Sequence, residues 1–479
     1  MSRFRFAFGR PPAVAARAMV ATSTPVATRA GLRAFERGGN AADAALAAAA
    51  ALAVTEPTSN GIGGDCFAIV WRDGRAEGLD SAGPAPMTAE PLSPVPQSGA
   101  QSVTVPGAVG GWGALAARHS RLGLDACLAD AIDAAERGYA VTPRTAEAWG
   151  RGSRVPAEYL PAPRVGRIVR QPELAATLRR IAEDGPSAFY EGEVARAVCE
   201  VTWLEEEDLA SFRPRWVEPL RVGYRGYEVL ELPPPTQGVA ALEGLGLLER
   251  GEPSLVAQVE CMRLALEDAF ERVRDGADVS DLIDPDYLDR RRAGVPRAVA
   301  EPAGGTVYLC AVDEDRMAVS FIQSNYEGFG SGLVAPGTGV ALQNRGACFA
   351  VCGAVEPGRR PYHTIIPGLL LRDGRLAGPF GVMGGFLQAQ AHLQLVSALV
   401  DDGLDPQAAL DRARFMVDGE RVLLEEGLWD RESVLRATGL DAVRSEDSFA
   451  FGGGQAIVVE HDVLVGGSDP RKDGYAAGI

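Results

Sequence analysis

The stretch GGTVYLCAVDEDRMAVSFIQSN, residues 304–325, joins two glycines to a threonine and two apolar runs. The runs TVYLCAVD (306–313) and MAVSFIQSN (317–325) flank the short polar turn EDR, a pattern that predicts a β-hairpin of buried strands. Thr306 therefore begins a stiff element directly after the most flexible joint of this segment, because glycine has the least restricted backbone. This position raises the hypothesis that the chain is cut before Thr306.

Cleavage of the Gly305–Thr306 bond gives the threonine a chemistry that it otherwise lacks. A free α-amine has a pKa near 7.7–8.0, so a neutral fraction exists at working pH and can accept the proton of the hydroxyl group. Gly304 and Gly305 make the uncut chain easy to distort, which helps Thr306 attack the carbonyl before it. Taken alone, a Gly-Thr strand start is typical of ordinary strands, and the hypothesis needs support from the rest of the sequence.

The two parts of the chain on either side of Gly305 differ in pattern. The first part is largely helical, with helices predicted at 41–54, across most of 124–210, at 239–249 and at 253–276, and with strands at 66–71 and 227–232. The proline-rich stretch 82–101 predicts a loop, and 102–112 predicts a strand and glycine turn leading into a helix near 113–120. The second part is strand-rich, with helices at 389–403 and 405–415 and a closing hairpin at 455–470.

Composition limits the classes of function. The 479 residues suffice for one large or two ordinary domains, and the net charge of −17 argues against a nucleic-acid surface. The apolar run 42–54 is too short to span a membrane, and no apolar signal region precedes Pro11. We therefore expect a cytoplasmic protein that binds neither nucleic acid nor membrane.

Familiar cofactor and metal motifs are missing from the sequence. The four histidines form no HExxH or other metal-spaced pair, and there is no CxxC pair, Walker loop, GxSxG elbow or helix-opening GxGxxG. The seven widely spaced cysteines support neither a zinc ribbon nor a disulfide scaffold. No cofactor and no metal are expected. A Ser-His-Asp triad is left open, although nothing marks one.

Several further segments occur in a fixed order along nearly the whole chain. They are residues 19–71 (MVATSTPVATRAGLRAFERGGNAADAALAAAAALAVTEPTSNGIGGDCFAIVW), 105–112 (VPGAVGGW), 231–240 (ELPPPTQGVA), 304–313, 329–345 (FGSGLVAPGTGVALQNR), 359–374 (RRPYHTIIPGLLLRDG), 381–385 (GVMGG) and 466–478 (GGSDPRKDGYAAG). In this combination the chain resembles the gamma-glutamyltransferase family of N-terminal-nucleophile hydrolases. The resemblance implies an α+β fold, a four-layer αββα sandwich made as one precursor and cleaved into segments 1–305 and 306–479. These segments would form a heterodimer, and a dimer of such heterodimers is left open.

The resemblance also assigns catalytic roles. The family's nucleophilic threonine falls on Thr306, and its helper hydroxyl group falls on Ser324. The family's oxyanion glycines fall on Gly384 and Gly385 in VMGGF, where a plain turn is the alternative interpretation. Paired backbone N–H groups at such a position can hold a developing oxyanion.

The sequence departs from the family where the γ-glutamyl group is recognised. The family binds the substrate α-carboxylate with an arginine on the loop after a strand like 67–81, but no Arg or Lys lies between Arg75 and Arg118. The family's acidic residue for the α-amine falls on Cys348, its paired serines fall on His363 and Thr364, and its asparagine falls on Tyr326. Because an arginine fork and a carboxylate are hard to replace, the glutamyl pocket looks lost.

Replacement residues for substrate binding are predicted within the same segments. Arg345, His363 and Tyr326 are candidates, and Arg345 suits an anionic acyl group such as oxamate or a dicarboxylic monoamide. A purely structural role for Arg345 is the alternative. Thr364 and Cys348 belong to the predicted substrate-binding set, and packing is the better explanation for the thiol.

Four functions stay open at this point. The first is an amide hydrolase that cleaves a small acyl-amide through an acyl-enzyme on Thr306. The second is a true γ-glutamyl transferase or glutathione hydrolase with a rearranged pocket. The third is a biosynthetic member of the family that breaks C–C bonds, and the fourth is an uncleaved relative without activity. The retention of Gly-Gly-Thr, Ser324 and the Gly384–Gly385 pair argues against the fourth.

Overall fold

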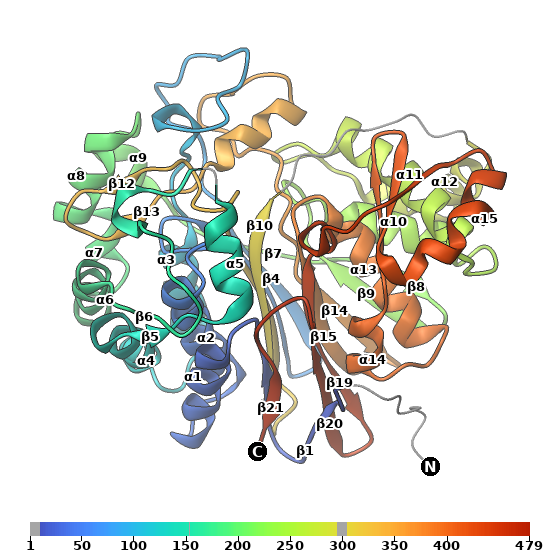
Figure 1. Ribbon diagram of the computed structural model, residues 1–479, viewed down its shortest axis with the longest axis horizontal. Helices are drawn as coiled ribbons and strands as arrows, with labels where there is room; N and C mark the ends of the chain where they lie inside the picture. The colour runs from blue at the N-terminus through green and yellow to red at the C-terminus, as the bar shows by residue number, and fades with distance from the viewer. Residues whose placement is uncertain (1–9, 153, 295–303) are drawn as a thin grey trace.

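The computed structural model describes residues 10–152, 154–294 and 304–479. Within these residues, two antiparallel seven-stranded sheets stand face to face at the centre of the molecule, with helices packed on both outer sides (Figure 1). The layers are therefore helix, sheet, sheet and helix, which confirms the predicted αββα sandwich.

The first sheet runs in the order β1 (Ala13–Ala15), β20 (Val463–Ser468), β19 (Gly453–Glu460), β15 (Arg375–Met383), β14 (Gly368–Arg372), β9 (Tyr227–Glu231) and β8 (Leu220–Tyr224). The second sheet runs in the order β21 (Ala476–Gly478), β2 (Met19–Ala21), β10 (Gly305–Val312), β11 (Ala318–Tyr326), β3 (Asp65–Arg72), β4 (Arg75–Ser81) and β7 (Arg215–Val217). Each sheet takes strands from both sides of Gly305.

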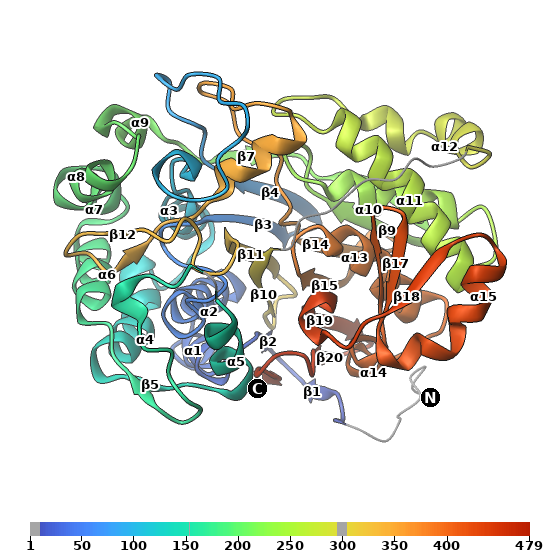
Figure 2. The same cartoon turned by 45° about the horizontal axis from the view of Figure 1, so that its top comes forward.

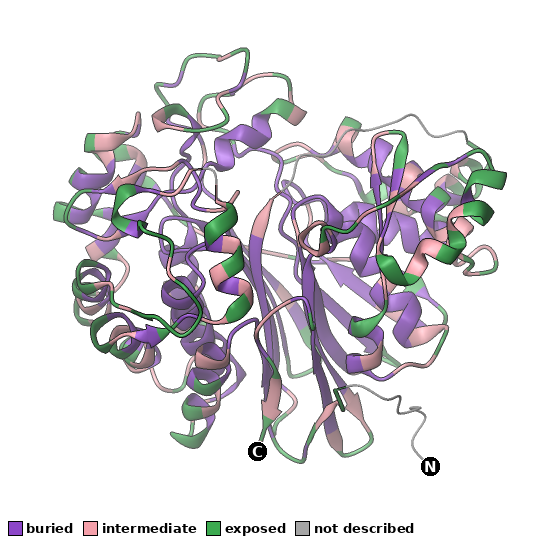
Figure 3. Ribbon diagram, viewed as in Figure 1, coloured by how far each residue is buried: buried purple, intermediate pink, exposed green. Residues whose placement is uncertain are grey.

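Strand β10 shows how the sequence pattern builds these layers. Val307, Leu309 and Ala311 face the outer helices, whereas Tyr308 and Cys310 face the other sheet. Successive side chains of a strand point to opposite faces, and a strand buried on both faces is continuously apolar. Both sheets are buried accordingly, as the purple strands of Figure 3 show.

The helices outside the second sheet come from the N-terminal half of the chain. They are α1 (Pro25–Glu36), α2 (Ala41–Thr55), α3 (Ala108–His119), α4 (Leu124–Arg137), α5 (Pro143–Arg151), α6 (Pro172–Asp184), α7 (Ser187–Tyr190), α8 (Gly192–Val201) and α9 (Glu206–Ser211). All residues of α2 are buried, and Figure 2 shows the helix surrounded by its neighbours. The alanines of α2 permit this, because small side chains let neighbouring backbones approach closely.

The helices outside the first sheet come from both sides of Gly305. They are α10 (Gly238–Leu248), α11 (Leu255–Arg272), α12 (Pro285–Arg291), α13 (Leu387–Val400), α14 (Pro406–Asp411) and α15 (Glu432–Ala437). Beside them lies a small sheet of β16 (Phe415–Asp418), β17 (Arg421–Leu424) and β18 (Asp441–Arg444). Two short pairs complete the described strands, β5 (Tyr139–Ala140) with β6 (Ile168–Val169) and β12 (Val334–Ala335) with β13 (Val340–Ala341).

Most predicted elements are confirmed, and one is wrong. The hairpin after Gly305, the alanine-rich helix and the closing hairpin β19–β20 form as predicted. The strand predicted within 102–112 does not form, because Pro106 lacks an N–H group, and the amides of Gly107 and Ala108 both donate to the carbonyl of Gly64. Helix α3 therefore starts at Ala108, several residues earlier than predicted. The prediction on the N-terminal signal rests mostly on residues 1–9, which lie outside the described residues.

Candidate active site

Thr306 lies at the start of β10, in the middle of the second sheet, and its side chain is only 2% exposed. Its Oγ1 lies 2.7 Å from the carbonyl oxygen of Gly305 and 3.3 Å from Oγ of Ser324. The amide Nε2 of Gln388 donates to it across 3.4 Å. The hydroxyl group is thus held against the peptide bond that precedes it.

Ser324 comes from β11, the partner strand of β10. The pairing of the two strands is irregular here, because Gly305 pairs with Tyr326 while Val307 pairs with Gln323. The extra residue forms a β-bulge, which re-aims side chains, and Tyr326 takes the rare φ of +77°. The bulge directs Ser324 Oγ to within 2.7 Å of the Gly305 carbonyl oxygen.

At Gly304 and Gly305, other backbone segments come so close that a side chain would crowd them. A Cβ on Gly304 would lie 3.0 Å from Cα of Gly385 and 3.3 Å from the carbonyl oxygen of Tyr326. A Cβ on Gly305 would lie 3.2 Å from the amide nitrogen of Gly328. Besides the easy distortion expected of them, the two glycines fill a narrow passage between neighbouring backbone segments.

Gly384 and Gly385 form the turn between β15 and α13. Their φ values of +136° and +60° favour glycine, and the turn leads directly into the N-terminus of the 14-residue helix α13. Gln237 fastens the turn by donating from Nε2 to the carbonyl groups of Gly385 and Thr364. N–H groups at a helix N-terminus favour negative charge, which suits an oxyanion.

The predicted substrate-binding residues gather behind Ser324. Arg345 begins the 3-10 helix η4 (Arg345–Val351), is fully buried, and donates to Ser324 Oγ at 3.1 Å and to Thr364 Oγ1 at 2.9 Å. Its guanidinium lies 4.6 Å from the ring centre of Tyr326, and Cys348 Sγ is 3.7 Å away. Burial raises the pKa of the Cys348 thiol, which fits a packing role.

His363 is part of a second polar contact, with Asp65. Its Nε2 lies 3.1 Å from Asp65 Oδ2, and both side chains are fully buried. Burial, together with the charge of Arg345, lowers the pKa of His363 well below its usual value, so the ring is neutral. Burial raises the pKa of Asp65 to about 7, against the opposing charge of Arg345 and a hydrogen bond from Gln343.

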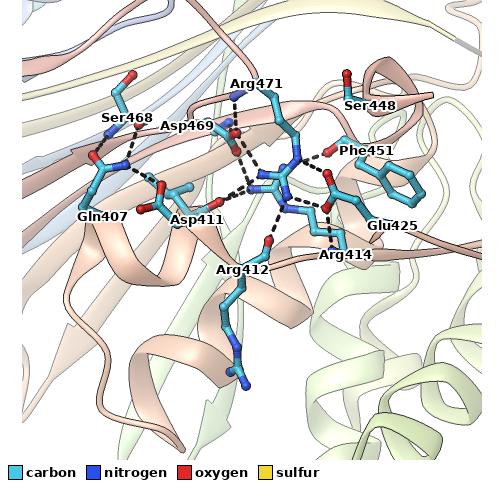
Figure 4. Close-up of polar contacts among 12 residues, drawn as sticks. Gln407, Asp411, Arg412, Arg414, Glu425, Ser448, Phe451, Ser468, Asp469 and Arg471 are labelled. Atoms are coloured by element: carbon cyan, nitrogen blue, oxygen red, sulfur yellow. Dashed lines mark hydrogen bonds and ion pairs between the residues drawn. The ribbon is translucent and has the colours of Figure 1, made fainter. Parts of the chain in front are cut away.

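A cavity of about 430 Å³ opens in front of Thr306. Gly304, Gly305, Thr306 and Gly384 contribute to its wall, together with the charged residues Arg151, Arg154, Glu327, Asp447, Arg471 and Lys472. These charges are paired, as Arg151 contacts Asp447 and Arg154 contacts Glu327. Arg471 pairs with Asp469 and Glu425, which lie on either side of its guanidinium in Figure 4.

Among the described residues, no group of three or more His, Cys, Asp or Glu side chains is arranged to hold a metal ion. In the same part of the chain, every helix is too short or too polar to cross a membrane.

The structure adds three residues that the sequence analysis missed. Asp65 lies opposite Ser324 in the β3–β11 pairing, Gln388 donates to Thr306, and Gln237 fastens the glycine turn. A signal was present for two of them. Asp65 ends the small-residue run GIGGD before a buried strand, and Gln237 ends the rigid turn PPPTQ. Gln388 sits in an ordinary helical pattern and carries no local signal.

Comparisons with known proteins agree with this geometry. The family model for gamma-glutamyltranspeptidase matches residues 27–479. The chain is 31% identical to the glutathione hydrolase-like YwrD proenzyme of Bacillus subtilis (strain 168), with 96% of this chain and 98% of that protein covered. It is 34% identical to the oxamate amidohydrolase proenzyme of Klebsiella pneumoniae, with 95% and 97% covered. The crystal structure of cephalosporin acylase from Bacillus halodurans superposes with a TM-score of 0.92 at 42% identity, covering 99% and 98% of the two chains.

The sandwich fold and its close structural relatives define the class of this protein as an N-terminal-nucleophile hydrolase. Within that class, the chain belongs to the gamma-glutamyltranspeptidase family. It is therefore an amide hydrolase or acyltransferase related to proenzymes, as the sequence predicted.

Proposed function

We propose that the chain is a proenzyme that cleaves itself between Gly305 and Thr306, and that Thr306 then cleaves the amide bond of a small acyl-amide. The proposal rests on one observation, that two hydroxyl groups contact the same carbonyl oxygen. Thr306 Oγ1 and Ser324 Oγ each lie 2.7 Å from the carbonyl oxygen of Gly305. An ordinary strand start needs no such arrangement.

Self-cleavage is an acyl shift followed by hydrolysis. Thr306 Oγ1 forms a bond to the Gly305 carbonyl carbon, the C–N bond to Thr306 breaks, and the hydroxyl proton passes to the departing nitrogen. Water then attacks the resulting ester, which leaves a carboxyl group on Gly305 and restores the threonine hydroxyl. The products are the segments 1–305 and 306–479, which stay together as a heterodimer because both contribute strands to each sheet.

In the cleaved enzyme, the free α-amine of Thr306 serves as the base for its own hydroxyl group. The oxyanion of the substrate is stabilised by the N–H groups of Gly384 and Gly385, supported by the N-terminus of α13. The amine part of the substrate leaves, an acyl-enzyme forms on Thr306, and water releases the acid. Ser324 keeps the nucleophile in position.

The acyl group is proposed to occupy the space that Gly304 and Gly305 vacate. In the uncut chain Gly304 separates Gly385 from the carbonyl of Tyr326, so its departure uncovers both. The cavity of about 430 Å³ lies within the range of small-molecule sites. Arg345, Tyr326, His363, Thr364 and Cys348 are proposed to shape this acyl pocket from behind Ser324. Arg345 favours an anionic acyl group, and a relative named as an oxamate amidohydrolase supports this choice.

A true glutathione hydrolase is the second candidate. It is favoured by the relative named as glutathione hydrolase-like, which aligns over nearly its full length. Release assays that compare a γ-glutamyl anilide with glutaryl and oxamate amides separate the two. Faster turnover of the glutaryl or oxamate amides supports the first function, and dominant γ-glutamyl turnover supports the second.

Denaturing electrophoresis with mass spectrometry tests the processing step. Active protein is expected to give two fragments, the smaller one beginning at Thr306. A single intact polypeptide in active material would exclude Thr306 as an N-terminal nucleophile. The cytoplasmic location expected from the sequence belongs to the same proposal, and cell fractionation tests it.

A further inference from the structure

The hydroxyl group of Ser324 contacts four groups, namely the Gly305 carbonyl oxygen, the amide of Tyr326, Arg345 and, at the longest distance of 3.3 Å, the hydroxyl group of Thr306. The amide N–H of Tyr326 donates to it across 2.8 Å, and Arg345 Nη2 donates across 3.1 Å. Both neighbours are donors only, so they occupy the lone pairs of the oxygen. The Gly305 carbonyl oxygen, at 2.7 Å, is an acceptor only. The single proton of Ser324 therefore points at the carbonyl group before Thr306, which is its shortest contact.

Arg345 supplies a positive charge to this contact from a buried position. Its guanidinium is fully buried, stacks on Tyr326, and donates to the hydroxyl groups of Ser324 and Thr364. Among the described residues, Arg345 hydrogen-bonds to Ser324, Thr364 and Cys348 and to no carboxylate oxygen, although its charge also acts on the carboxyl group of Asp65. A positive charge with no directly bonded carboxylate polarises the hydroxyl group to which it donates, and the effect is strong where water is excluded.

We infer that Arg345 is a positioning residue for self-cleavage. It acts through Ser324, whose proton stabilises the oxyanion that forms on Gly305 when Thr306 attacks. The inference rests on the proposed self-cleavage and adds the group that activates the scissile carbonyl. As Thr306 Oγ1 bonds to the Gly305 carbon, the electron pair moves onto the carbonyl oxygen, and it returns when the C–N bond breaks. Ser324 donates a hydrogen bond throughout and loses no proton.

This assignment separates processing from turnover. During processing, the oxyanion belongs to Gly305 and faces Ser324. During turnover, the oxyanion belongs to the substrate and is proposed to face Gly384 and Gly385. Substitutions at Arg345 are therefore expected to slow the appearance of the 306–479 fragment.

The test follows cleavage of the purified full-length chain over time by denaturing electrophoresis. Ser324→Ala is expected to slow cleavage about 10²–10³-fold, the usual effect of removing one oxyanion donor, whereas Ser324→Thr keeps the hydroxyl group and stays within about tenfold of the wild type. Arg345→Met is expected to slow cleavage at least tenfold. Arg345→Lys keeps a positive charge and is expected to cleave at least tenfold faster than Arg345→Met.

If Arg345 has only a structural role, the cleavage rates of the variants are expected to fall in the same order as their melting temperatures. Melting temperatures are therefore measured for both Arg345 variants and for Arg360→Met. Arg360 is a matched control because it is also a buried arginine. It pairs with Asp80 and Asp275 and does not contact Ser324. Arg360→Met is expected to lose stability and, wherever it remains folded, to cleave at the wild-type rate.

Each outcome decides between the two proposals. If the wild type cleaves but Arg345→Met and Arg345→Lys cleave equally fast, the inference is wrong and the proposed function stands. The same holds if Ser324→Ala cleaves at the wild-type rate. If the wild type stays intact in active material, both are wrong. If Arg345→Met does not fold, the comparison of Arg345→Lys with the wild type decides. If Arg345→Lys loses no more cleavage rate than Arg360→Met does for the same drop in melting temperature, the inference is wrong.

Discussion

Ser324 lies directly opposite Asp65 in the pairing of β11 with β3. One strand pair thus carries the hydroxyl group that contacts Thr306 and a fully buried carboxyl group whose neighbours include His363. Arg345 bonds to Ser324, and its charge acts on both Asp65 and His363. The nucleophile is therefore linked through Ser324 to Arg345, whose charge reaches the buried Asp65–His363 pair, so substitutions at that pair are expected to affect the site.

Thr306→Ala is expected to remain a single polypeptide and to have no amide-hydrolase activity. Alanine lacks the hydroxyl group that attacks the Gly305 carbonyl, while the buried start of β10 still accommodates a smaller side chain. Denaturing electrophoresis and a release assay check both parts. Thr177→Ala, which alters a buried threonine of α6 far from the cavity, is the control and is expected to be cleaved normally. Fragments of the expected sizes from Thr306→Ala would refute self-cleavage by this residue.

Gly384→Ala is expected to lower kcat about 10²–10³-fold per cleaved molecule. A residue with a side chain is strained at a φ of +136°, and its Cβ would lie 3.1 Å from Cα of Gly452, so the turn shifts and its N–H groups leave their positions. Steady-state kinetics on the cleaved fraction measure the effect.

Gly403→Ala is the control for that substitution. Gly403 has a φ of +62° in a loop with open space around its Cβ, so alanine there costs about 1–2 kcal/mol of stability and leaves kcat unchanged. Equal kcat values for the Gly384→Ala enzyme and the wild type contradict the oxyanion role.

The nucleophile hairpin was predictable from the sequence because its information is local. An apolar run, a polar turn and a second apolar run specify β10 and β11, and the alanine-rich run after Asn40 specifies α2. The pairing of Ser324 with Asp65 is not local, since it depends on how two strands distant in the chain align.

The strand predicted near Val103 failed for a related reason. Val103 and Val105 are apolar and buried, as strand residues are, but their segment joins neither sheet: the amide of Val105 donates to the carbonyl of Pro84, and Trp203 donates to the carbonyl of Val103. The local sequence pattern indicates a buried, extended segment, whereas a strand also needs a neighbouring strand with unpaired backbone N–H and C=O groups. The bulge at Tyr326 was equally invisible, because nothing in SNYEG marks a non-glycine residue with positive φ.

Asp65→Asn is expected to change how stability depends on pH. Burial raises the pKa of Asp65 to about 7, whereas in the unfolded chain this carboxyl group titrates near pH 4. Between these values the folded state binds more protons, so the contribution of Asp65 to the free energy of unfolding falls as pH rises from about 4 to 7. Asparagine keeps an acceptor oxygen and does not titrate.

Melting temperatures of wild type and Asp65→Asn, compared from pH 5 to pH 8, measure this contribution. The stability of the wild type relative to the variant is expected to decrease as pH rises. A difference that stays constant across this range contradicts the raised pKa.

Asp469→Asn is expected to lower the free energy of unfolding by about 3–5 kcal/mol, because it leaves buried guanidinium charge without its partner. Asp469 is fully buried and accepts from Arg414 at 2.5 Å and from Arg471 at 2.9 Å (Figure 4). Burial opposes its ionisation, but these two arginines outweigh burial and lower the pKa of Asp469.

The matched control for this cluster is Asp402→Asn, which breaks the exposed pair of Asp402 with Arg412 and is expected to change stability by at most about 1 kcal/mol. Chemical denaturation of the three proteins at pH 7 gives the comparison. Because Arg471 and Lys472 form part of the cavity wall, Asp469→Asn is also expected to lower activity at temperatures where it is still folded. If Asp469→Asn and Asp402→Asn proved equally stable, the buried pairs of Asp469 with Arg414 and Arg471 would not stabilise this part of the cavity wall.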